Sequence, residues 1–407
     1  MPTLFQINTT LNYGSTGRIA EQIAITAQRH GWDCVTAHGG RYVGKSEFPS
    51  ILVGNKMDNY FHAFYGEFFG RHGLGSTQST KRLIKKIKEF SPSLIHLHNI
   101  HGYYLNYKVL FDFFAEISTP IVWTLHDCWS FTGHCTHFEN VGCEKWKTEC
   151  NHCPLLMAQY KSRLIDRSRS NFLLKKELYA KLDTITIVPV SNWLASVVSQ
   201  SILGKFPIKV IQNGVDLEVF SPIGNDIRAK YSISDNKMVV LSVMNGYDIE
   251  KGIEEINRIA DEKDYTVIVV GLPNGLSNRI SQKIINVGRT RSQSELAAYY
   301  SAADVFLNPT YNDTFPTTNI EALACGTPVI TYRTGGSPEI IDEKTGIVVD
   351  KGDYGGLIKA IDMIQQKGKS AYTDACRLHA VEKYDKNERF MDYINLYNEI
   401  LTNKEQR

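Results

Sequence analysis

The feature that most restricts the fold is the alternation of short β-branched runs with longer helical segments. Several of the runs are apolar on both faces, which is typical of parallel strands covered by helices on either side of a sheet. They form two series, one at 3–7, 34–37, 94–98, 121–125 and 185–190, and one at 239–243, 267–270, 305–308, 329–332 and 347–349. Because the alternation restarts, the sequence predicts an α/β protein with two doubly wound domains in tandem.

The two domains are expected to meet near residue 205. At about 150 residues per domain, a chain of 407 residues holds two or three domains. The segment 208–222 is the best candidate hinge, because Asn213-Gly214 is a turn signal directly after a strand. We therefore assign 1–205 to an N-terminal domain and 206–387 to a C-terminal domain, with a helix over about 388–407 that could pack back on the first.

Composition and charge exclude several classes of protein. With 43% hydrophobic and 22% charged residues, the chain is typical of globular proteins rather than disordered ones. The formal net charge of +2 is too small for a protein that coats nucleic acid along its whole length. The N-terminus lacks the basic and apolar regions of a secretory signal, and no apolar run reaches spanning length. We expect a cytoplasmic protein that is soluble or lies on a membrane surface.

A glycine-containing loop follows the first expected strand. Gly14, Gly17 and Arg18 lie between that strand and a helical pattern over 19–30. Glycines in such a turn allow backbone N–H groups to approach a phosphate at the helix N-terminus, where the helix dipole also favours an anion. The spacing is not G-x-G-x-x-G, so a tight turn that binds nothing explains the loop equally well.

The segment 308–328 is the most informative stretch of the chain. A strand ends near Asn308, Asp313 lies in the following loop, and a short helix is expected from about Pro316 to Gly326. The first amides of this helix, at Thr317 and Thr318, could hold a diphosphate. Glu321 follows about 6 Å further along the helix, which is the reach from a phosphate to a ribose. The alternative is a helix-capping Asp and a solvated Glu.

These residues carry a resemblance to a known family. Asp313, seven further residues, Glu321 and the sequence Ala-Leu-Ala-Cys-Gly-Thr-Pro-Val resemble the E-x7-E region of retaining glycosyltransferases of family 4. Matching positions extend over most of the chain, at 14–18, 97–98, 124–127, 190–191, 213–216, 251–252 and 294–309. The segment 123–154 looks like the colanic acid, O-antigen and capsule branch of that family. The resemblance implies the GT-B fold, in which two Rossmann-like domains face each other across a cleft.

The resemblance also implies roles for individual residues. Glu321 would bind the ribose hydroxyls of a nucleotide-sugar donor, and Asp313 the hydroxyls of its sugar. Lys251 would neutralise the leaving phosphate. His126, at the carboxyl end of a strand, would face the donor sugar and the reacting centre, although a core histidine is the alternative.

Two positions depart from the family pattern. Asp313 stands where the family usually has Glu, and Asn245 stands where an Arg commonly precedes the phosphate-binding Lys. Arg18 or Arg289 is expected to supply the missing charge. The chain contains no D-x-D pair for a divalent metal, so we expect no cofactor for catalysis and charge compensation by Lys, Arg and helix amides.

The expected reaction follows from the resemblance. It is hexosyl transfer with retention at the anomeric carbon, in which the departing phosphate helps to deprotonate the acceptor and no protein nucleophile is needed. The expected partners are a nucleotide-sugar and a lipid-linked or oligosaccharide acceptor of bacterial surface polysaccharide, and not nucleic acid. The alternatives are a GT-B sugar-nucleotide epimerase and, from another class, a zinc-dependent protein that binds nucleic acid.

Four of the eight cysteines are spaced along the sequence as the ligands of a metal ion often are. Cys135, Cys143, Cys150 and Cys153 offer four soft ligands in a short loop, and the final C-x-x-C is the usual tight half of a zinc site. The sequence therefore predicts a structural zinc. Unligated thiols or a disulfide pair are the alternatives.

Residues 60–90 combine aromatic and basic side chains. Aromatic residues gather at 60–69, and 80–90 place Leu83, Ile84, Ile87 and Phe90 on one helical face with cations around it. Such a segment could rest on anionic lipid at the inner face of the plasma membrane. The alternative is an amphipathic helix docked on its own sheet with a solvated basic face.

Overall fold

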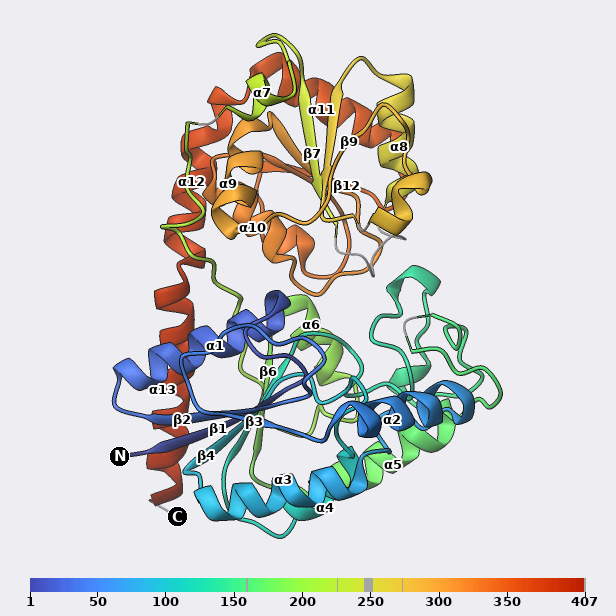
Figure 1. The fold of residues 1–407 in the computed structure, drawn as a ribbon, viewed down its shortest axis with the longest axis vertical. Helices are drawn as coiled ribbons and strands as arrows, with labels where there is room; N and C mark the ends of the chain where they lie inside the picture. The colour runs from blue at the N-terminus through green and yellow to red at the C-terminus, as the bar shows by residue number, and fades with distance from the viewer. Residues whose placement is uncertain (159, 225, 245–251, 273, 406–407) are drawn as a thin grey trace. The chain divides into compact units, whose positions relative to one another are not determined.

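The computed structural model divides into two compact units (Figure 1). It describes residues 1–158, 160–224, 226–244, 252–272 and 274–405. The first unit comprises Met1–Gln212 together with Asn387–Arg407, and the second comprises Asn213–Lys386. The division therefore falls at the Asn213-Gly214 turn, a little beyond residue 205, and the end of the chain belongs with the first unit.

The first unit is built on a six-stranded parallel sheet in the order β3-β2-β1-β4-β5-β6. The strands are β1 (Thr3–Asn8), β2 (Asp33–His38), β3 (Ser50–Leu52), β4 (Leu94–Leu97), β5 (Ile121–Leu125) and β6 (Ile185–Pro189). The helices are α1 (Gly14–Arg29), α2 (Lys56–Phe69), α3 (Thr77–Phe90), α4 (Tyr107–Phe114), α5 (Ser168–Ala180) and α6 (Asn192–Ser199). β4 and β5 are buried along their whole length, as their unbroken apolar patterns predict.

The C-terminal helix α13 (Lys386–Glu405) completes the core of the first unit. Phe390, Tyr393 and Tyr397 on this helix are buried in one cluster with Ile23 of α1 and Val122 of β5. The Tyr397 hydroxyl also lies 2.6 Å from Nδ1 of His96 on β4. The last helix is therefore part of the first unit both in its apolar packing and in its hydrogen bonding.

The second unit repeats the architecture, with the parallel order β12-β11-β10-β7-β8-β9. Its strands are β7 (Val239–Val243), β8 (Thr266–Val270), β9 (Ile285–Val287), β10 (Val305–Asn308), β11 (Val329–Tyr332) and β12 (Gly346–Val349). Its helices are α7 (Ile227–Lys230), α8 (Ile253–Glu262), α9 (Gln293–Ala302), α10 (Thr317–Ala324), α11 (Tyr354–Lys367) and α12 (Ser370–Tyr384).

The strand orders locate the expected binding edges. In each sheet the chain starts in the middle, builds outward to one side and then returns to the other, so the order reverses between β1 and β4 and between β7 and β10. In doubly wound sheets, ligands bind beyond the carboxyl ends of the strands at such a reversal. The loops that follow β7 and β10, and those that follow β1 and β4, are therefore the places to look for a site.

Candidate active site

The acid-bearing helix of the second unit lies at the carboxyl end of β10, next to the reversal. Helix α10 begins at Thr317 with Pro316 as its N-cap residue, so Pro316 sits one position before the helix rather than inside it. Thr317 and Thr318 are the first two residues of the helix, where backbone N–H groups have no intrahelical acceptor. The predicted diphosphate amides and Glu321 thus share one short helix.

Glu321 is held in place by a tyrosine. The hydroxyl of Tyr300, at the end of α9, donates a hydrogen bond to Oε2 of Glu321 at 3.0 Å. Tyr300 is fully buried, and burial together with the Glu321 charge raises its pKa well above 10, so the hydroxyl stays protonated and can donate. Tyr300 therefore orients this carboxylate, a role that sequence reasoning missed because nothing in the Tyr299-Tyr300 pair distinguishes it from core packing.

The loop between β10 and α10 is fixed at several points. Oδ1 of Asp313 accepts the backbone N–H of Phe315 at 3.3 Å. Nδ2 of Asn308 donates to Oδ1 of Asn319 at 2.8 Å, which ties the end of β10 to the first turns of α10. Asp313 and Glu321 therefore extend from a rigid segment.

Gly252, directly before α8, lies close to this loop. Gly252 has a positive φ of 71°, and a Cβ atom there would lie 2.5 Å from the carbonyl oxygen of Pro309. Only glycine permits this approach. Lys251 and Asn245, for which a phosphate role was weighed, lie outside the described residues.

Arg289 is not brought to the reversal by the sheet topology. It follows β9, the edge strand, and β8 separates that strand from β7. Its side chain is exposed. Its proposed contact with the diphosphate therefore stays a prediction.

In the first unit, the glycine loop opens α1. Gly14 has φ of 67° and is the first residue of the helix. A Cβ atom on Gly17 would lie 2.6 Å from Oγ1 of Thr10, so close packing already requires this glycine. Arg18 is exposed. Close packing is one reason for Gly17, and donor binding by Gly14, Gly17 and Arg18 remains a prediction.

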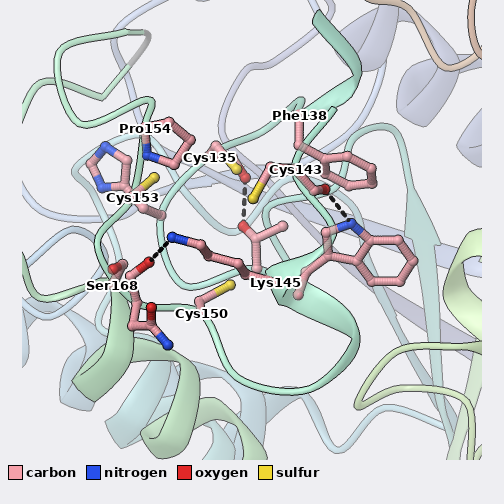
Figure 2. Close-up of a pocket in the computed structure, with 12 residues that line it drawn as sticks. Cys135, Phe138, Cys143, Lys145, Cys150, Cys153, Pro154 and Ser168 are labelled. Carbon is pink, nitrogen blue, oxygen red and sulfur yellow. Dashed lines mark hydrogen bonds between the residues drawn. The ribbon is translucent and has the colours of Figure 1, made fainter. Parts of the chain in front are cut away.

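The four cysteines lie in the long connection that follows β5. Figure 2 shows Cys135, Cys143, Cys150 and Cys153 around one cavity, which His134 also lines. None of these cysteines forms a disulfide. In the parts of the chain that the structure describes, no three His, Cys, Asp or Glu side chains stand as a ready metal-binding group.

His126 is the first residue after β5 and is joined to a chain of buried polar groups. Its Nε2 lies 3.1 Å from Nδ1 of His98, and Nε2 of His98 lies 3.0 Å from Oε1 of Gln6 on β1. Gln6 in turn donates through Nε2 to the carbonyl oxygen of Ala20 at 3.0 Å. The chain of contacts crosses the three neighbouring strands β1, β4 and β5.

These contacts define the protonation state of His126. The amide group of Gln6 donates to Ala20, so its Oε1 faces His98 and must accept. His98 therefore carries its proton on Nε2 and accepts at Nδ1, which makes Nε2 of His126 the donor. Burial lowers the pKa of His126 to about 4, and that of His98 well below its usual value. His126 is accordingly a neutral imidazole with its lone pair on Nδ1.

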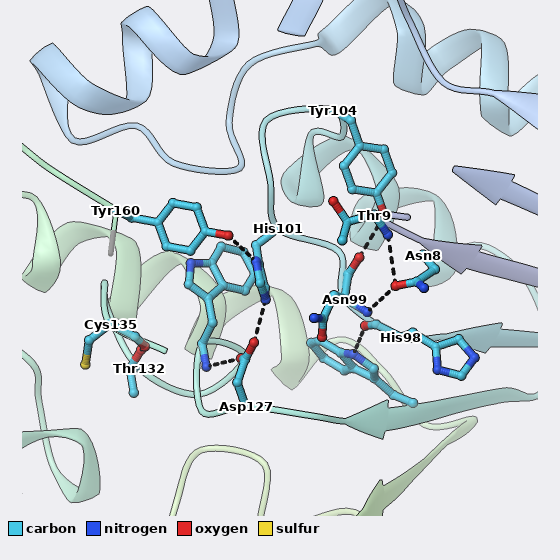
Figure 3. A network of polar contacts seen from close by, with 12 residues as sticks. Asn8, Thr9, His98, Asn99, His101, Tyr104, Asp127, Thr132, Cys135 and Tyr160 are labelled. Atoms are coloured by element: carbon cyan, nitrogen blue, oxygen red, sulfur yellow. Dashed lines mark hydrogen bonds and ion pairs between the residues drawn. The ribbon is translucent and has the colours of Figure 1, made fainter. Parts of the chain in front are cut away.

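A second polar network continues from the same edge (Figure 3). Oδ2 of Asp127 lies 2.7 Å from Nε2 of His101, whose Nδ1 lies 2.6 Å from the hydroxyl of Tyr160. Burial by itself would raise the pKa of Asp127, but His101 outweighs this effect and the pKa falls to about 2. Oδ1 of Asn8 accepts the backbone N–H of Asn99, which links the ends of β1 and β4. The carboxyl edge of the first sheet is therefore polar and preorganised.

Fold and site together define a two-domain α/β enzyme with an acid-bearing helix at the reversal of its second sheet. Residues 18–219 match the family model described as Glycosyltransferase Family 4, and residues 238–367 match the model described as Glycosyl transferases group 1. The chain belongs to the glycosyltransferases of family 4, and the resemblance drawn from its motifs is confirmed.

Similar proteins agree with this assignment. The chain is 23% identical over 372 residues to the colanic acid biosynthesis glycosyl transferase WcaC of Escherichia coli K12, covering 88% of this chain and 89% of the relative. Sucrose-phosphate synthase from Thermosynechococcus elongatus superimposes with a TM-score of 0.74 at 18% identity, covering 99% and 100% of the two chains. HepE of Anabaena, solved in complex with UDP-glucose, gives a TM-score of 0.66 at 16% identity, covering 97% and 99%. The predicted GT-B fold is confirmed.

Proposed function

We propose that this glycosyltransferase moves a sugar, with retention, from a nucleotide-sugar to a lipid-linked saccharide in bacterial surface polysaccharide assembly. The observation that carries the proposal is helix α10, which brings the predicted diphosphate amides and the Tyr300-anchored Glu321 to the reversal between β7 and β10. The name of WcaC supports the polysaccharide context, and the UDP-glucose complex of HepE supports a nucleotide-sugar donor.

Helix α10 and the loop before it bind both ends of the donor. The ribose hydroxyls donate to the Glu321 carboxylate, while the amides of Thr317 and Thr318 bind the diphosphate at the positive end of the helix dipole. Asp313 accepts hydrogen bonds from the sugar. Because the backbone of this segment is fixed, these interactions need little reorganisation during the reaction.

In the transfer step, the bond between the anomeric carbon and the donor phosphate oxygen breaks. The acceptor oxygen forms its bond to that carbon on the same face, and the acceptor proton passes to the departing phosphate. Lys251 and the helix amides offset the negative charge of that phosphate. His126 hydrogen-bonds the donor sugar as a neutral imidazole, so it does not oppose the positive charge that develops at the anomeric carbon.

An exposed aromatic face on α2 favours a membrane-bound acceptor. Tyr60, Phe61, Phe64 and Tyr65 are 44% to 67% exposed. Such a run of exposed aromatic side chains on one helix suits contact with a membrane or a partner. Helix α3 buries Leu83 and Ile87, as the docked alternative predicts, and exposes its basic side chains.

The two helices are linked, because Asp58 of α2 accepts from Ser79 of α3 at 2.7 Å. Basic and aromatic side chains on linked helices suit the interface of an anionic bilayer. No helix of the described ranges is long and apolar enough to span one.

A transfer assay with acceptors in two forms tests the proposal. Wild-type protein should release nucleotide from the donor only when a saccharide acceptor is present, and the product should retain the anomeric configuration. The variant Tyr60→Ser/Phe61→Ser/Phe64→Ser should lose at least about tenfold in transfer to a lipid-linked acceptor in anionic vesicles, because three aromatic groups no longer enter the interface. Transfer to a short water-soluble acceptor should be unchanged.

The matched control is Leu378→Ser, which removes a side chain that is 57% exposed in the second unit. It should leave both rates unchanged. Donor turnover without an acceptor would favour the epimerase alternative, and equal losses with both acceptors would contradict the membrane role of α2.

A further inference from the structure

The connection between β5 and α5 is unusually long for a segment with so little regular structure. Over residues 126–167 its only helical turns are η1 (Glu139–Val141) and η2 (Lys145–Lys147), within the described part of the segment. Loops of this length in compact domains need a reason to stay ordered. Part of the reason is a small core, in which Phe138 stacks on Trp146 with ring centroids 5.0 Å apart.

The four cysteines of this segment line one small, partly open cavity beside that core. The cavity measures about 10 Å³, which is room for a single small ion or water molecule. The thiols of Cys135 and Cys153 are already hydrogen-bonded to each other. The buried Nε2 of His134, on the cavity wall, has no hydrogen-bond partner in the described structure.

The backbone around the cavity is arranged to support sulfur ligands. The N–H of Gly133 donates to Sγ of Cys150 at 3.3 Å, and the backbone of Leu155 donates to the Cys153 sulfur. Lys145 donates to the carbonyl oxygens of Asn151 and His152 at 3.0 and 3.1 Å, which holds the C-x-x-C turn in shape. Hydrogen bonds of this kind orient and stabilise thiolate ligands around a metal.

A buried lysine near the cysteines also bears on the charge of the site. Lys175 of α5 is 1% exposed and donates to the carbonyl oxygens of Trp129 and Thr132, on the segment that leads to Cys135. The carboxylate of Asp127, which acts on Lys175 through space, is paired with His101 instead. Burial lowers the pKa of Lys175 to about 7, and its amino group lies 3.4 Å from the centroid of the Trp129 ring. A divalent ion with four thiolates carries a net charge of −2, which would favour the charged form of this lysine.

We infer that Cys135, Cys143, Cys150 and Cys153 hold one zinc ion in a tetrahedral, structural site. As the side chains are oriented here, no three ligands share a point, so binding requires the thiols to turn into the cavity and to release their protons. Four thiolates leave no open coordination position, which assigns the ion to stability and not to catalysis. The site would anchor the segment that starts with His126 and Asp127.

Metal analysis tests the inference independently of transferase activity. Protein purified without chelator should contain one zinc per chain, and Cys150→Ser/Cys153→Ser should contain less than a tenth of that and melt at a lower temperature. The control Cys325→Ser/Cys376→Ser removes two buried cysteines of the second unit and should keep its zinc. Cobalt substituted for zinc should show the visible absorption of a tetrahedral thiolate site.

Three results would overturn the assignment. They are wild-type protein without zinc, wild-type protein with an iron–sulfur absorption in place of zinc, and a disulfide between Cys135 and Cys153 in peptides prepared without reductant. Because each is measured on the wild-type chain, the test holds even if the double variant does not fold.

Discussion

His126→Ala is expected to transfer sugar at least about 100-fold more slowly than the wild type while binding free nucleotide equally well. His126 belongs to the first unit, whereas the proposed nucleotide contacts belong to α10 of the second. The lost group is a neutral imidazole whose orientation is set by His98 and Gln6. Its removal therefore affects the reacting sugar and not the affinity for the nucleotide.

Two substitutions at His98 distinguish its role in orienting His126 from a role in packing alone. His98→Asn keeps an acceptor at the position of Nδ1 and should retain most of the transfer rate, whereas His98→Leu removes the acceptor and should lose most of it. Steady-state rates, with kcat and KM resolved, check both expectations. Near wild-type transfer by His126→Ala, or equal rates for the two His98 variants, would show that this imidazole chain plays no part in the reaction.

Three buried histidines of the first unit are together expected to remove about 3 to 4 kcal/mol of its unfolding free energy between pH 6 and pH 5. His96 and His98, whose pKa values burial also lowers, should add to this loss. Burial lowers the pKa of His62 and His126 to about 4 and that of His72 to about 3. In the unfolded chain these groups titrate near 6.5, so below that pH the unfolded state binds more protons. Their stabilising effect is fully present above about pH 6.5 and is lost as the pH falls toward 4.

Tryptophan fluorescence can follow this unit alone, because the five tryptophans are Trp32, Trp123, Trp129, Trp146 and Trp193. Urea unfolding at pH 7.5, 6 and 5 should show a falling midpoint. His62→Gln removes one of these groups and should reduce the loss between pH 6 and pH 5 by about 1 kcal/mol. The control His30→Gln, at an exposed position, should not. An unfolding midpoint that is independent of pH would mean that these histidines do not control stability.

The parallel core could be predicted from the sequence because its strands are buried on both faces. β1, β4, β5, β7 and β10 were all recognised as apolar runs. β3 and β9 were not, because each has only three residues at the edge of a sheet, where half-exposed positions need no apolar pattern. Short, half-exposed runs carry little of the signal that periodicity detects, whereas the edge strands β6 and β12 were predicted.

Only those parts of the candidate site that lie in contiguous motifs could be predicted from the sequence. Asp313, Glu321 and His126 stand in contiguous motifs, so a resemblance could find them. Tyr300, His98 and Gln6 act through contacts between distant elements, and Gln6 and His98 are separated by 92 positions. Only the folded sheet brings such partners together.

Nucleotide affinity gives a direct test of the ribose contact assigned to Glu321. Titration calorimetry with UDP, GDP, ADP and their sugars should find one base that binds the wild type. Glu321→Ala should weaken binding of both the nucleotide and its sugar by about 1.5 to 3 kcal/mol, or roughly 10- to 100-fold, because a charged hydrogen-bond acceptor for ribose is lost.

Two further variants provide an intermediate case and a control for Glu321→Ala. Tyr300→Phe keeps the carboxylate but frees it from its hydrogen bond, so it should weaken binding by a smaller factor. Glu343→Ala removes an exposed carboxylate of the same unit and should have no effect. Affinity should fall in the order wild type, Tyr300→Phe, Glu321→Ala. Equal nucleotide affinity in the wild type and Glu321→Ala would show that Glu321 does not bind the ribose.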